Sequence, residues 1–342
     1  MSMTYLVTGA AGFIGYYISK ALIAAGHTVI GLDSVTDYYR TDLKEERLTL
    51  LDRMANKNQW IFYRGNIENP DLVERIFKQH TFDRVIHLAA QAGVRYSITN
   101  PFAYTSSNID GFLTILEACR RHKTPHLAFA SSSSVYGMNR KVPFCETDPV
   151  DHPVSLYAAT KRANELMAHT YSHLYGLPVT GMRFFTVYGP MGRPDMAYFK
   201  FAEAIMNGTP IDVYNNGDLY RDFTYVDDAA KAIIMIADTP AKCDSGFDAE
   251  HPALDRSSAP YRIYNIGNES PEKLEDFISI LEKKLGMKAI KNYLPMQMGD
   301  VYMTAADTSA LEKDFGWKPS TPLETGLERF TEWFKEKKIW QR

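Results

Sequence analysis

A tyrosine and a lysine four positions apart could carry acid–base chemistry in this chain. Tyr157 and Lys161 stand in the stretch YAATK, inside a helical pattern, so their side chains share one helical face. A free tyrosine has a pKa of about 10 and is a poor base at neutral pH. A lysine ammonium at about 4 Å would favour the phenolate by roughly 4 kcal/mol, or about three pKa units. Tyr157 is therefore predicted to take a proton from a substrate hydroxyl.

Three glycines near the N-terminus indicate a nucleotide site. A short apolar run leads into TGAAGFIG, which holds Gly9, Gly12 and Gly15, and a helical pattern follows. Glycine permits close backbone approach, and the free N–H groups of a helix N-terminus bind a pyrophosphate. Asp33 ends the next apolar run, where a carboxylate accepts hydrogen bonds from a ribose diol and repels the 2′-phosphate of NADP. The sequence therefore predicts an NAD site.

The elements that must position these residues alternate between strand and helix. Short β-rich runs stand between helical patterns at residues 4–8, 27–33, 59–66, 82–90, 125–133 and 178–189. This alternation predicts βαβ units and a parallel sheet with helices on both faces, which binds ligands at the carboxyl ends of its strands. The predicted fold class is α/β, with a Rossmann-like doubly wound parallel sheet and a smaller, mixed α/β C-terminal substrate lobe.

The predicted domain boundary is discontinuous. Residues 1–189 are expected to form an NAD-binding Rossmann domain, to which residues 224–240 and about 261–268 return. Residues 190–223 and 269–342 are expected to form the smaller lobe, because amphipathic helices there are joined by short strands and turns. Residues between these segments, 242–260, are expected to form a surface loop.

Composition excludes several classes of partner. The 342 residues carry a formal net charge of −3, which gives no reason to expect a nucleic acid or a membrane surface. The cysteines, Cys119, Cys145 and Cys243, form no CxxC pair, so neither disulfides nor a zinc site are expected. His169 and His173 have metal-ligand spacing on a helix but no third ligand nearby, so no metal is predicted. Without a signal peptide or transmembrane run, the protein is expected to be cytoplasmic.

Further motifs run along nearly the whole chain: HLAAQAGVR, SSSSVYG, YAATK, RFFTVYGP, RDFTYVDD and NIG, besides the glycine turn. Together they resemble an extended short-chain dehydrogenase/reductase that acts on nucleotide sugars. AAQAGVRYS and RFFTVYGPMGRPDMA are most similar to the corresponding stretches of UDP-glucuronate 4-epimerases. This resemblance implies tightly held NAD, a UDP-sugar substrate bound by the smaller lobe, and a homodimer.

The resemblance also implies roles for single residues. Tyr157 would be the base, Lys161 would also bind the nicotinamide ribose, and Ser132 would hydrogen-bond the sugar 4-hydroxyl. Asn66 stands where relatives usually have an aspartate that faces the adenine amine, and its amide oxygen can still accept that hydrogen bond. The other cofactor contacts implied, the glycine turn and Asp33 included, are Gly9, Ala11, Gly12, Phe13, Ile14, Gly15, Asp33, Ile67, Leu88, Ala89, Ala90, Gln91, Asn108, Ser131 and Phe184.

The serine row distinguishes this chain from related activities. Dehydratases of the superfamily place an Asp-Glu pair before VYG, and UDP-glucuronate decarboxylases resemble them with a glutamate, whereas this chain has Ser133 and Ser134. Hydroxyls do not titrate near pH 7, which favours oxidation and re-reduction at one carbon. The 4-keto form of a glucuronate is a β-keto acid and can lose carbon dioxide. We therefore expect Ser133, Ser134, Thr186 and Arg193 to clamp the carboxylate, for which a guanidinium fork is suited.

The predicted function is the interconversion of UDP-glucuronate and UDP-galacturonate. By analogy, Arg221 would meet the diphosphate and Asp300 the uridine ribose; Arg95 would bind phosphate or carboxylate, or form an ion pair within the protein. Arg193 could instead contact the diphosphate or lie at the surface. The alternative activities are a UDP-glucose or UDP-N-acetylglucosamine 4-epimerase and, after these, a UDP-glucuronate decarboxylase. A nucleotide-sensing binding module without turnover is the alternative from another class, because a fold alone does not establish chemistry.

Overall fold

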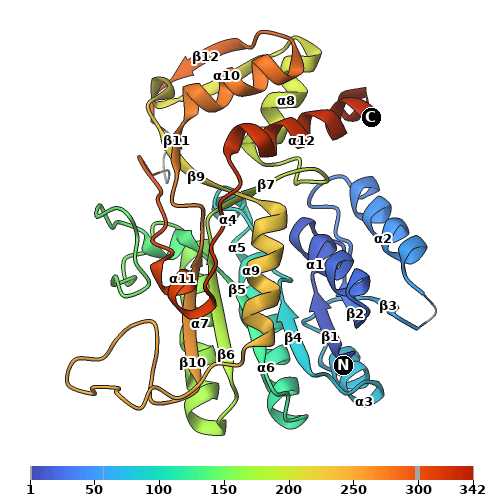
Figure 1. Ribbon diagram of the computed structural model, residues 1–342, viewed down its shortest axis with the longest axis vertical. Helices are drawn as coiled ribbons and strands as arrows, with labels where there is room; N and C mark the ends of the chain where they lie inside the picture. Colours follow the sequence, from blue (N-terminus) through green and yellow to red (C-terminus); the bar gives the residue numbers. More distant parts are fainter. Residues whose placement is uncertain (1, 57, 297–300, 342) are drawn as a thin grey trace.

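The computed structural model describes residues 2–56, 58–296 and 301–341, and its centre is a seven-stranded parallel sheet (Figure 1). The strands lie in the order β10-β6-β5-β4-β1-β2-β3. Their bounds are β1 (Thr4–Thr8), β2 (Thr28–Asp33), β3 (Trp60–Arg64), β4 (Arg84–His87), β5 (Leu127–Ser132), β6 (Val179–Phe184) and β10 (Tyr261–Ile266). The order reverses between β1 and β4, which is where sheets of this kind bind a dinucleotide.

Helices cover both faces of the sheet. One face packs against α1 (Phe13–Ala24) and α9 (Val226–Asp238), and α2 (Asp42–Met54) lies beside α1. The other face packs against α3 (Pro70–Gln79), α6 (Gly111–Arg121) and α7 (Leu156–Tyr175). Alternate strand residues serve the two cores, since Tyr5 and Val7 face one core and Leu6 the other. The predicted α/β class is confirmed.

The helix that carries the Tyr–Lys pair has sequence signals at both ends. The Ser155 side chain accepts a hydrogen bond from the backbone N–H of Ala158 and caps the start of α7. Gly176 ends the helix in the left-handed conformation, with φ of 64°. Tyr157 therefore lies in the first turn of α7 and Lys161 one turn further on, next to the carboxyl end of β5.

Short turns connect the larger elements. Between β4 and α6 the chain forms α4 (Tyr96–Thr99), α5 (Pro101–Tyr104) and a π-helical turn over Thr105–Asp110. A 3₁₀ turn over Ser133–Tyr136 follows β5. Two further 3₁₀ turns, over Asn215–Gly217 and Ile339–Gln341, follow β8 and α12. The π-helical turn lies next to the cavity described below, a common place for such turns.

The smaller lobe is built from two short sheets and amphipathic helices (Figure 1, top). A three-stranded sheet has the order β11-β9-β7, and β12 pairs with β8 in parallel. The bounds are β7 (Thr186–Tyr188), β8 (Pro210–Tyr214), β9 (Tyr220–Tyr225), β11 (Pro271–Lys273), β12 (Ile290–Leu294), α8 (Ala197–Asn207), α10 (Leu274–Leu285) and α12 (Leu323–Glu336). Helix α11 (Ser309–Phe315), expected in the lobe, packs instead against β10 of the main sheet, where Phe315 meets the ring of Tyr264 (Figure 1).

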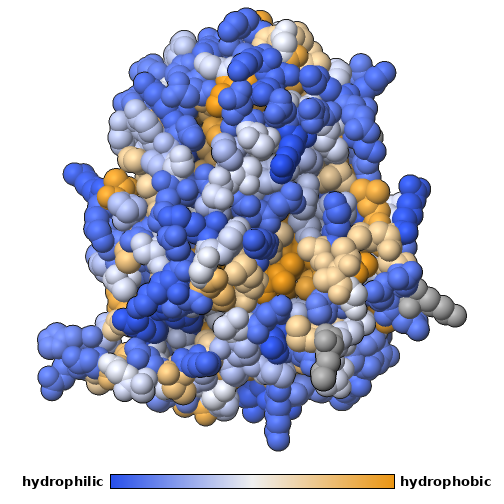
Figure 2. Space-filling model, viewed as in Figure 1, coloured by the Kyte–Doolittle hydropathy of each residue, from blue (hydrophilic) through white to orange (hydrophobic). Residues whose placement is uncertain are grey.

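One strand prediction needs correction. The run at 178–189, expected to be a single strand, is divided at Phe185 into β6 of the main sheet and β7 of the lobe sheet. The chain thus passes from one sheet to the other within a single apolar run, which hydrophobicity alone does not reveal. Residues 242–260 form an extended loop without helix or strand, as expected (Figure 1). Figure 2 shows that this face of the molecule is mostly hydrophilic over the lobe and the loop.

Candidate active site

A cavity of about 700 Å³ runs along the carboxyl ends of the central strands. The turns after β1, β2 and β3 line one end of it, with the glycine turn and Asp33. The turns after β5 and β6 line the other end, with Ser131–Ser134, Tyr157 and Arg193. The cavity therefore joins the predicted nucleotide residues to the predicted acid–base residues.

The glycine turn is shaped for close backbone approach. Gly9 has φ of 73°, and a Cβ atom there would lie 2.8 Å from the backbone nitrogen of Ala89. Gly12 precedes α1 without a side-chain cap, so the first N–H groups of the helix face the cavity without a competing side chain. Asp33 accepts the backbone N–H of Ala11 at 3.0 Å, which fixes its carboxylate at the end of β2. This arrangement fits the pyrophosphate and ribose of a dinucleotide.

Most of the predicted cofactor residues line the cavity, and two do not. The lining includes Gly9, Gly12, Phe13, Ile14, Gly15, Asp33, Asn66, Ile67, Leu88, Ala89, Ala90, Gln91, Ser131, Tyr157, Lys161 and Phe184. Ala11 lies in the turn but behind the surface of the cavity. Asn108 is buried in the π-helical turn, where its side chain accepts the N–H of Gln91 at 2.8 Å and donates to the carbonyl of Gln91 at 3.0 Å. Asn108 therefore positions the segment after β4.

Tyr157, Lys161 and Ser132 come together at the sugar end of the cavity. The Lys161 ammonium is buried and donates to the carbonyl of Ala130 at 2.9 Å. The Ser132 hydroxyl lies near enough to the Tyr157 phenol to lower its pKa, and the phenol ring packs edge-on against Tyr104 with 6.0 Å between centroids. A phenol and a lysine on adjacent turns are thus held beside the serine row.

The expected effect of Lys161 on the tyrosine is not found in the protein alone. Burial raises the pKa of Tyr157, and the influences that lower it come from Ser132 and from the charge of Arg193. Burial also lowers the pKa of Lys161 to about 8, against the attraction of Glu165. The prediction considered only the lysine charge, whereas the partial burial of Tyr157 in the cavity wall makes desolvation of the phenol the larger effect. The positive charge of an oxidised nicotinamide would act in the opposite direction.

A buried ion pair beneath the serines was not predicted. Glu165 accepts a hydrogen bond from the Ser131 hydroxyl at 2.6 Å, and it accepts from one edge of the Arg183 guanidinium, from Nε at 2.9 Å and from Nη2 at 3.0 Å. Burial would raise the pKa of Glu165, but Arg183 and Ser131 hold it below its ordinary value. The signal was present in the sequence, since Glu165 lies one helical turn beyond Lys161 and faces the same side. This pair fixes the end of β5, from which the serines project.

Arg193 lines the sugar end and is already paired. Its guanidinium donates to both oxygens of Asp195, from Nε at 3.0 Å and from Nη2 at 2.6 Å. The Tyr38 hydroxyl donates to the same carboxylate at 3.4 Å. The Nη1 edge of Arg193 is not used in this pair and remains for other acceptors. Ser132, Ser133, Ser134 and Thr186 also line the cavity.

Two predicted substrate residues, Arg95 and Arg221, lie outside the cavity lining. Arg95 is not part of the cavity lining and has no ion pair among the described residues; its guanidinium lies over the ring of Tyr214 at 5.5 Å from the centroid. Arg221 stands on β9 and donates to the carbonyls of Tyr220 at 2.8 Å and Tyr302 at 3.2 Å. The prediction for Asp300 falls outside the described residues. The ion-pair alternative for Arg95 is thus replaced by a cation–π contact.

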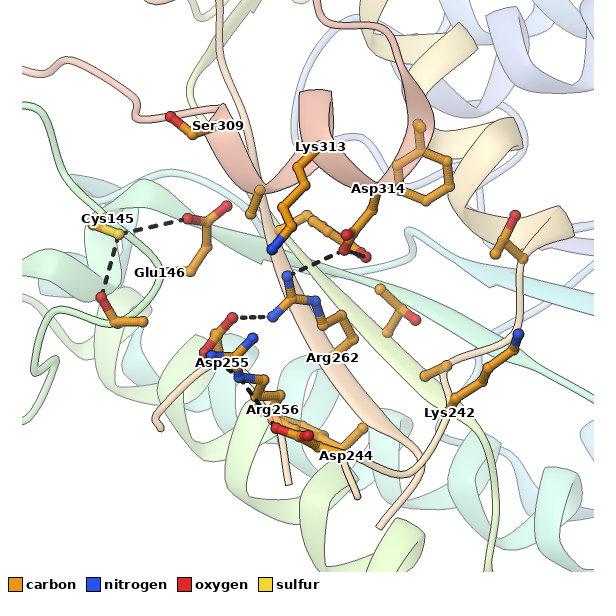
Figure 3. Close-up of a pocket in the computed structure, with 18 of the residues that line it drawn as sticks. Cys145, Glu146, Lys242, Asp244, Asp255, Arg256, Arg262, Ser309, Lys313 and Asp314 are labelled. Atoms are coloured by element: carbon orange, nitrogen blue, oxygen red, sulfur yellow. Dashed lines mark hydrogen bonds and ion pairs between the residues drawn. The ribbon is translucent and has the colours of Figure 1, made fainter. Parts of the chain in front are cut away.

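A second cavity, of about 610 Å³, lies beside the edge strand β10 (Figure 3). Several of its charges are paired within the protein, since Arg262 bonds to Asp255 and Asp314 and Arg256 pairs with Asp244. Glu146 also lines it, and burial raises the pKa of this carboxyl to about 7. The paired charges favour a structural role for this region over a binding site.

No metal site is found in the part of the chain that the structure describes, because no three metal-ligating side chains gather there. His169 and His173 stack with their ring centroids 6.4 Å apart, and His169 shares a 2.9 Å hydrogen bond with Ser257. Across the same described ranges, no helix has the length and apolar character needed to span a membrane.

Known proteins are similar to this chain in sequence and in fold. A probable UDP-glucuronate 4-epimerase of Rhizobium meliloti (strain 1021) is 47% identical, over 98% of this chain and 97% of the relative. The UDP-glucuronic acid 4-epimerase of Bacillus cereus, solved with UDP-glucuronic acid and NAD, superposes with a TM-score of 0.85 at 31% identity, over 98% of this chain and 100% of that chain. The UDP-glucose 4-epimerase of Thermotoga maritima, solved with UDP-glucose, has a TM-score of 0.83 at 29% identity, over 98% and 99% of the two chains.

The family follows from the extent of these matches. Residues 5–267 fit the family model described as the NAD dependent epimerase/dehydratase family, which is well over half of the chain. The matched segment contains the glycine turn, the serine row and the Tyr157–Lys161 pair. This chain therefore belongs to the NAD dependent epimerase/dehydratase family.

Proposed function

We propose that this protein is a UDP-glucuronate 4-epimerase, which interconverts UDP-glucuronate and UDP-galacturonate by oxidation and re-reduction at C4. One observation carries the proposal. The sugar end of the cavity combines the phenol of Tyr157 and the ammonium of Lys161 with the guanidinium of Arg193 and a row of hydroxyls. The carboxylates among the described lining residues are Asp33 and Glu68, which both follow strands at the nucleotide end. Such a site favours proton transfer at one hydroxyl over elimination.

The cofactor would lie along the turn that joins β1 to α1. The N–H groups after Gly12 would bind its pyrophosphate, Asp33 its adenosine ribose and Lys161 its nicotinamide ribose. A nicotinamide held there would supply the acceptor and donor of the hydride for oxidation and re-reduction at C4 of the sugar. Asn66 and the segment Leu88–Gln91 would line the space between these groups.

The acid–base steps belong to the chain itself. Tyr157 would take the proton from O4 as C4 is oxidised and return it to the oxygen on re-reduction. Ser132 lines the cavity beside Tyr157 and would hold the same sugar hydroxyl. Lys161, buried and fixed on the Ala130 carbonyl, would keep a positive charge beneath the pair while it is protonated.

The carboxylate of the sugar would be held by Arg193, Ser133, Ser134 and Thr186. A 4-keto glucuronate loses carbon dioxide when its C5–C6 bond aligns with the carbonyl π system. Holding the carboxylate so that this bond stays near the carbonyl plane would suppress that loss. The Nη1 edge of Arg193 supports this role, because Asp195 occupies the opposite edge and fixes the plane of the fork.

The remaining substrate contacts are assigned with the two domains of the chain. We assign residues 1–189, with 224–240 and about 261–268, to the NAD-binding domain, and 190–223 with 269–342 to the UDP-sugar lobe. The pairing of β10 with β6 and the packing of α9 on the main sheet support this division. Arg221 would meet the diphosphate, with Arg95 and Asp300 near the substrate.

We also propose that the protein is a cytoplasmic homodimer. Helices α6 and α7 lie side by side and expose Leu113, Leu166 and Leu174. Phe102, in the adjoining α5, is 82% exposed. An apolar surface on paired helices supports association of two copies.

The test is an assay of the purified protein with UDP-glucuronate, UDP-glucose and UDP-N-acetylglucosamine, with products identified by mass spectrometry and NMR. The proposal predicts UDP-galacturonate as the main product. Faster turnover of UDP-glucose to UDP-galactose would establish a UDP-hexose 4-epimerase, which the similarity to the Thermotoga maritima enzyme favours as second candidate. A UDP-pentose would indicate a decarboxylase, and no turnover of any of them would favour a binding module.

A further inference from the structure

A buried arginine that no motif pointed to lies behind the cavity wall, between the glycine turn and the segment before Arg193. Arg47, on α2, is 0% exposed and has no carboxylate within ion-pair distance among the described residues. Its donors bind backbone carbonyls and one phenol instead. A buried guanidinium is costly unless its donors are all used, so this arrangement needs a reason beyond packing.

The carbonyls belong to two segments that are far apart in the sequence. Nη1 of Arg47 donates to the carbonyl of Ala11 at 2.8 Å, inside the glycine turn. Nε and Nη2 donate to the carbonyl of Met191 at 3.2 and 2.7 Å, and Nη2 also reaches that of Gly192 at 3.2 Å. One guanidinium thus connects the nucleotide turn to the residues directly before Arg193.

The segment before Arg193 needs such an anchor. Met191 has φ of 56°, a left-handed conformation that is unfavourable for a residue with a side chain. The hydroxyl of Tyr198 accepts the backbone N–H of Arg193 at 3.2 Å. Arg47 holds the carbonyl side of this strained turn and Tyr198 holds the amide side. The direction in which the Arg193 side chain leaves the backbone is therefore fixed from two sides.

We infer that Arg47 is a positioning residue that fixes the Arg193 guanidinium relative to the nucleotide turn and thereby sets selectivity for a sugar carboxylate. The inference rests on the proposed role of Arg193. A lysine cannot replace Arg47, because a single ammonium lacks the planar fork that reaches both segments at once. Tyr39 supports the fork, since its hydroxyl accepts from Nη1 at 2.8 Å and its ring lies 5.7 Å from the guanidinium carbon.

The first measurement is calorimetric titration of Arg47→Lys with UDP-glucuronate and UDP-glucose. NAD released on denaturation is measured for each sample, so that the sugars are compared at equal cofactor content. We expect affinity for UDP-glucuronate to fall about tenfold, the size of one charge-assisted hydrogen bond, and affinity for UDP-glucose to change less than about twofold. Arg53→Lys, an exposed position on the same helix, is the matched control and should change neither.

The second measurement is a double-mutant cycle with Arg193→Ala. If Arg47 acts through Arg193, Arg47→Lys should have no further effect on UDP-glucuronate binding once Arg193 is removed. Equal weakening of both sugars by Arg47→Lys, or additive losses in the cycle, would overturn the inference and leave Arg47 a general stabiliser.

The cycle separates this inference from the proposed function. Arg193→Ala alone reports on the clamp, and an equal loss for both sugars in that variant would reject the clamp and the Arg47 inference with it. A selective loss for Arg193→Ala with additive losses in the cycle would reject the Arg47 inference alone. If Arg47→Lys does not fold, Tyr39→Phe removes one acceptor of the same guanidinium and should shift selectivity in the same direction, about threefold. An unchanged ratio of the two affinities in Tyr39→Phe would contradict the inference.

Discussion

Arg193 and Asp195 form a two-point ion pair at the sugar end of the cavity, with Nε to Oδ1 at 3.0 Å and Nη2 to Oδ2 at 2.6 Å. The protein's own carboxylate therefore binds the edge of the guanidinium that lies away from Nη1. A sugar carboxylate at Nη1 would meet a group whose plane is already fixed, so little side-chain freedom would be lost on binding. This relationship distinguishes a prepared anion site from a surface arginine.

Arg193→Ala should weaken UDP-glucuronate binding by about tenfold to a hundredfold and UDP-glucose binding much less. A charge-assisted hydrogen bond is worth roughly 1.5–3 kcal/mol. UDP-glucose cannot form it, because its sugar has no carboxylate. The loosened 4-keto sugar should also lose carbon dioxide, so a UDP-pentose by-product should appear in mass spectra. Ser133→Ala should act in the same way but more mildly. Equal losses for the two sugars without pentose would show that Arg193 binds the diphosphate.

Tyr157→Phe should remove nearly all turnover and leave UDP-sugar binding largely unchanged. The phenol oxygen is the predicted base, and loss of such a group commonly costs about 10²–10⁴-fold in rate. The ring and its edge-on packing against Tyr104 remain in the variant. Initial rates and calorimetric binding of UDP-glucuronate measure the two effects separately. Activity within about twofold of wild type would mean that another group serves as the base.

Glu146 should make the protein less stable as the pH rises. Burial raises the pKa of its carboxyl from 4.5 to about 7, so the folded protein keeps a proton that the unfolded chain releases between these values. The protonated carboxyl makes its full contribution to the free energy of unfolding below pH 4.5. That contribution is lost as the pH rises through about 7. Relative to wild type, Glu146→Gln should therefore gain up to about 3 kcal/mol between pH 4.5 and 8.

Urea unfolding of both proteins at several pH values measures this difference. Thr147→Val, which changes a residue of the same cavity wall that does not titrate, serves as the control and should show no such gain over that range. Parallel pH profiles for wild type and Glu146→Gln would show that Glu146 is ionised in the folded protein like an exposed acid.

Leu166→Lys should convert the proposed homodimer to monomers without unfolding it. Leu166 is 54% exposed on α7, so a charge there is tolerated by a monomer but not by an apolar interface. Light scattering gives the mass, and circular dichroism checks the fold. Met287→Lys, at an exposed apolar position beyond α10, is the control and should stay dimeric. A wild-type monomer, or a dimeric Leu166→Lys, would place the interface elsewhere or remove it.

Local patterns predicted those parts of the site whose residues are close together in the sequence. The glycine turn, Asp33 and the Tyr157–Lys161 pair each lie within one βα unit or one helix, so spacing alone placed them. Arg47 and Asp195 could not be found in this way. Arg47 matters because it bonds to residues 36 and 144 positions away, and only the tertiary structure brings those carbonyls together.

The electrostatic prediction failed for a related reason. The strength of the Tyr157–Lys161 interaction was estimated from spacing, whereas the pKa of Tyr157 is set mainly by burial, which depends on everything packed around the phenol. Likewise, the division of residues 178–189 between β6 and β7 depends on which sheet each half can join. The hydrophobic pattern is the same for both halves.

The most direct test of the proposed chemistry is to incubate the purified protein with UDP-glucuronate in deuterium oxide and to locate deuterium in the product by NMR. A hydride that leaves C4 and returns to it does not exchange with solvent, and the proton handled by Tyr157 ends on oxygen. The account predicts UDP-galacturonate with no deuterium on carbon at C4 or C5. Deuterium at C5, or the absence of UDP-galacturonate, would contradict it.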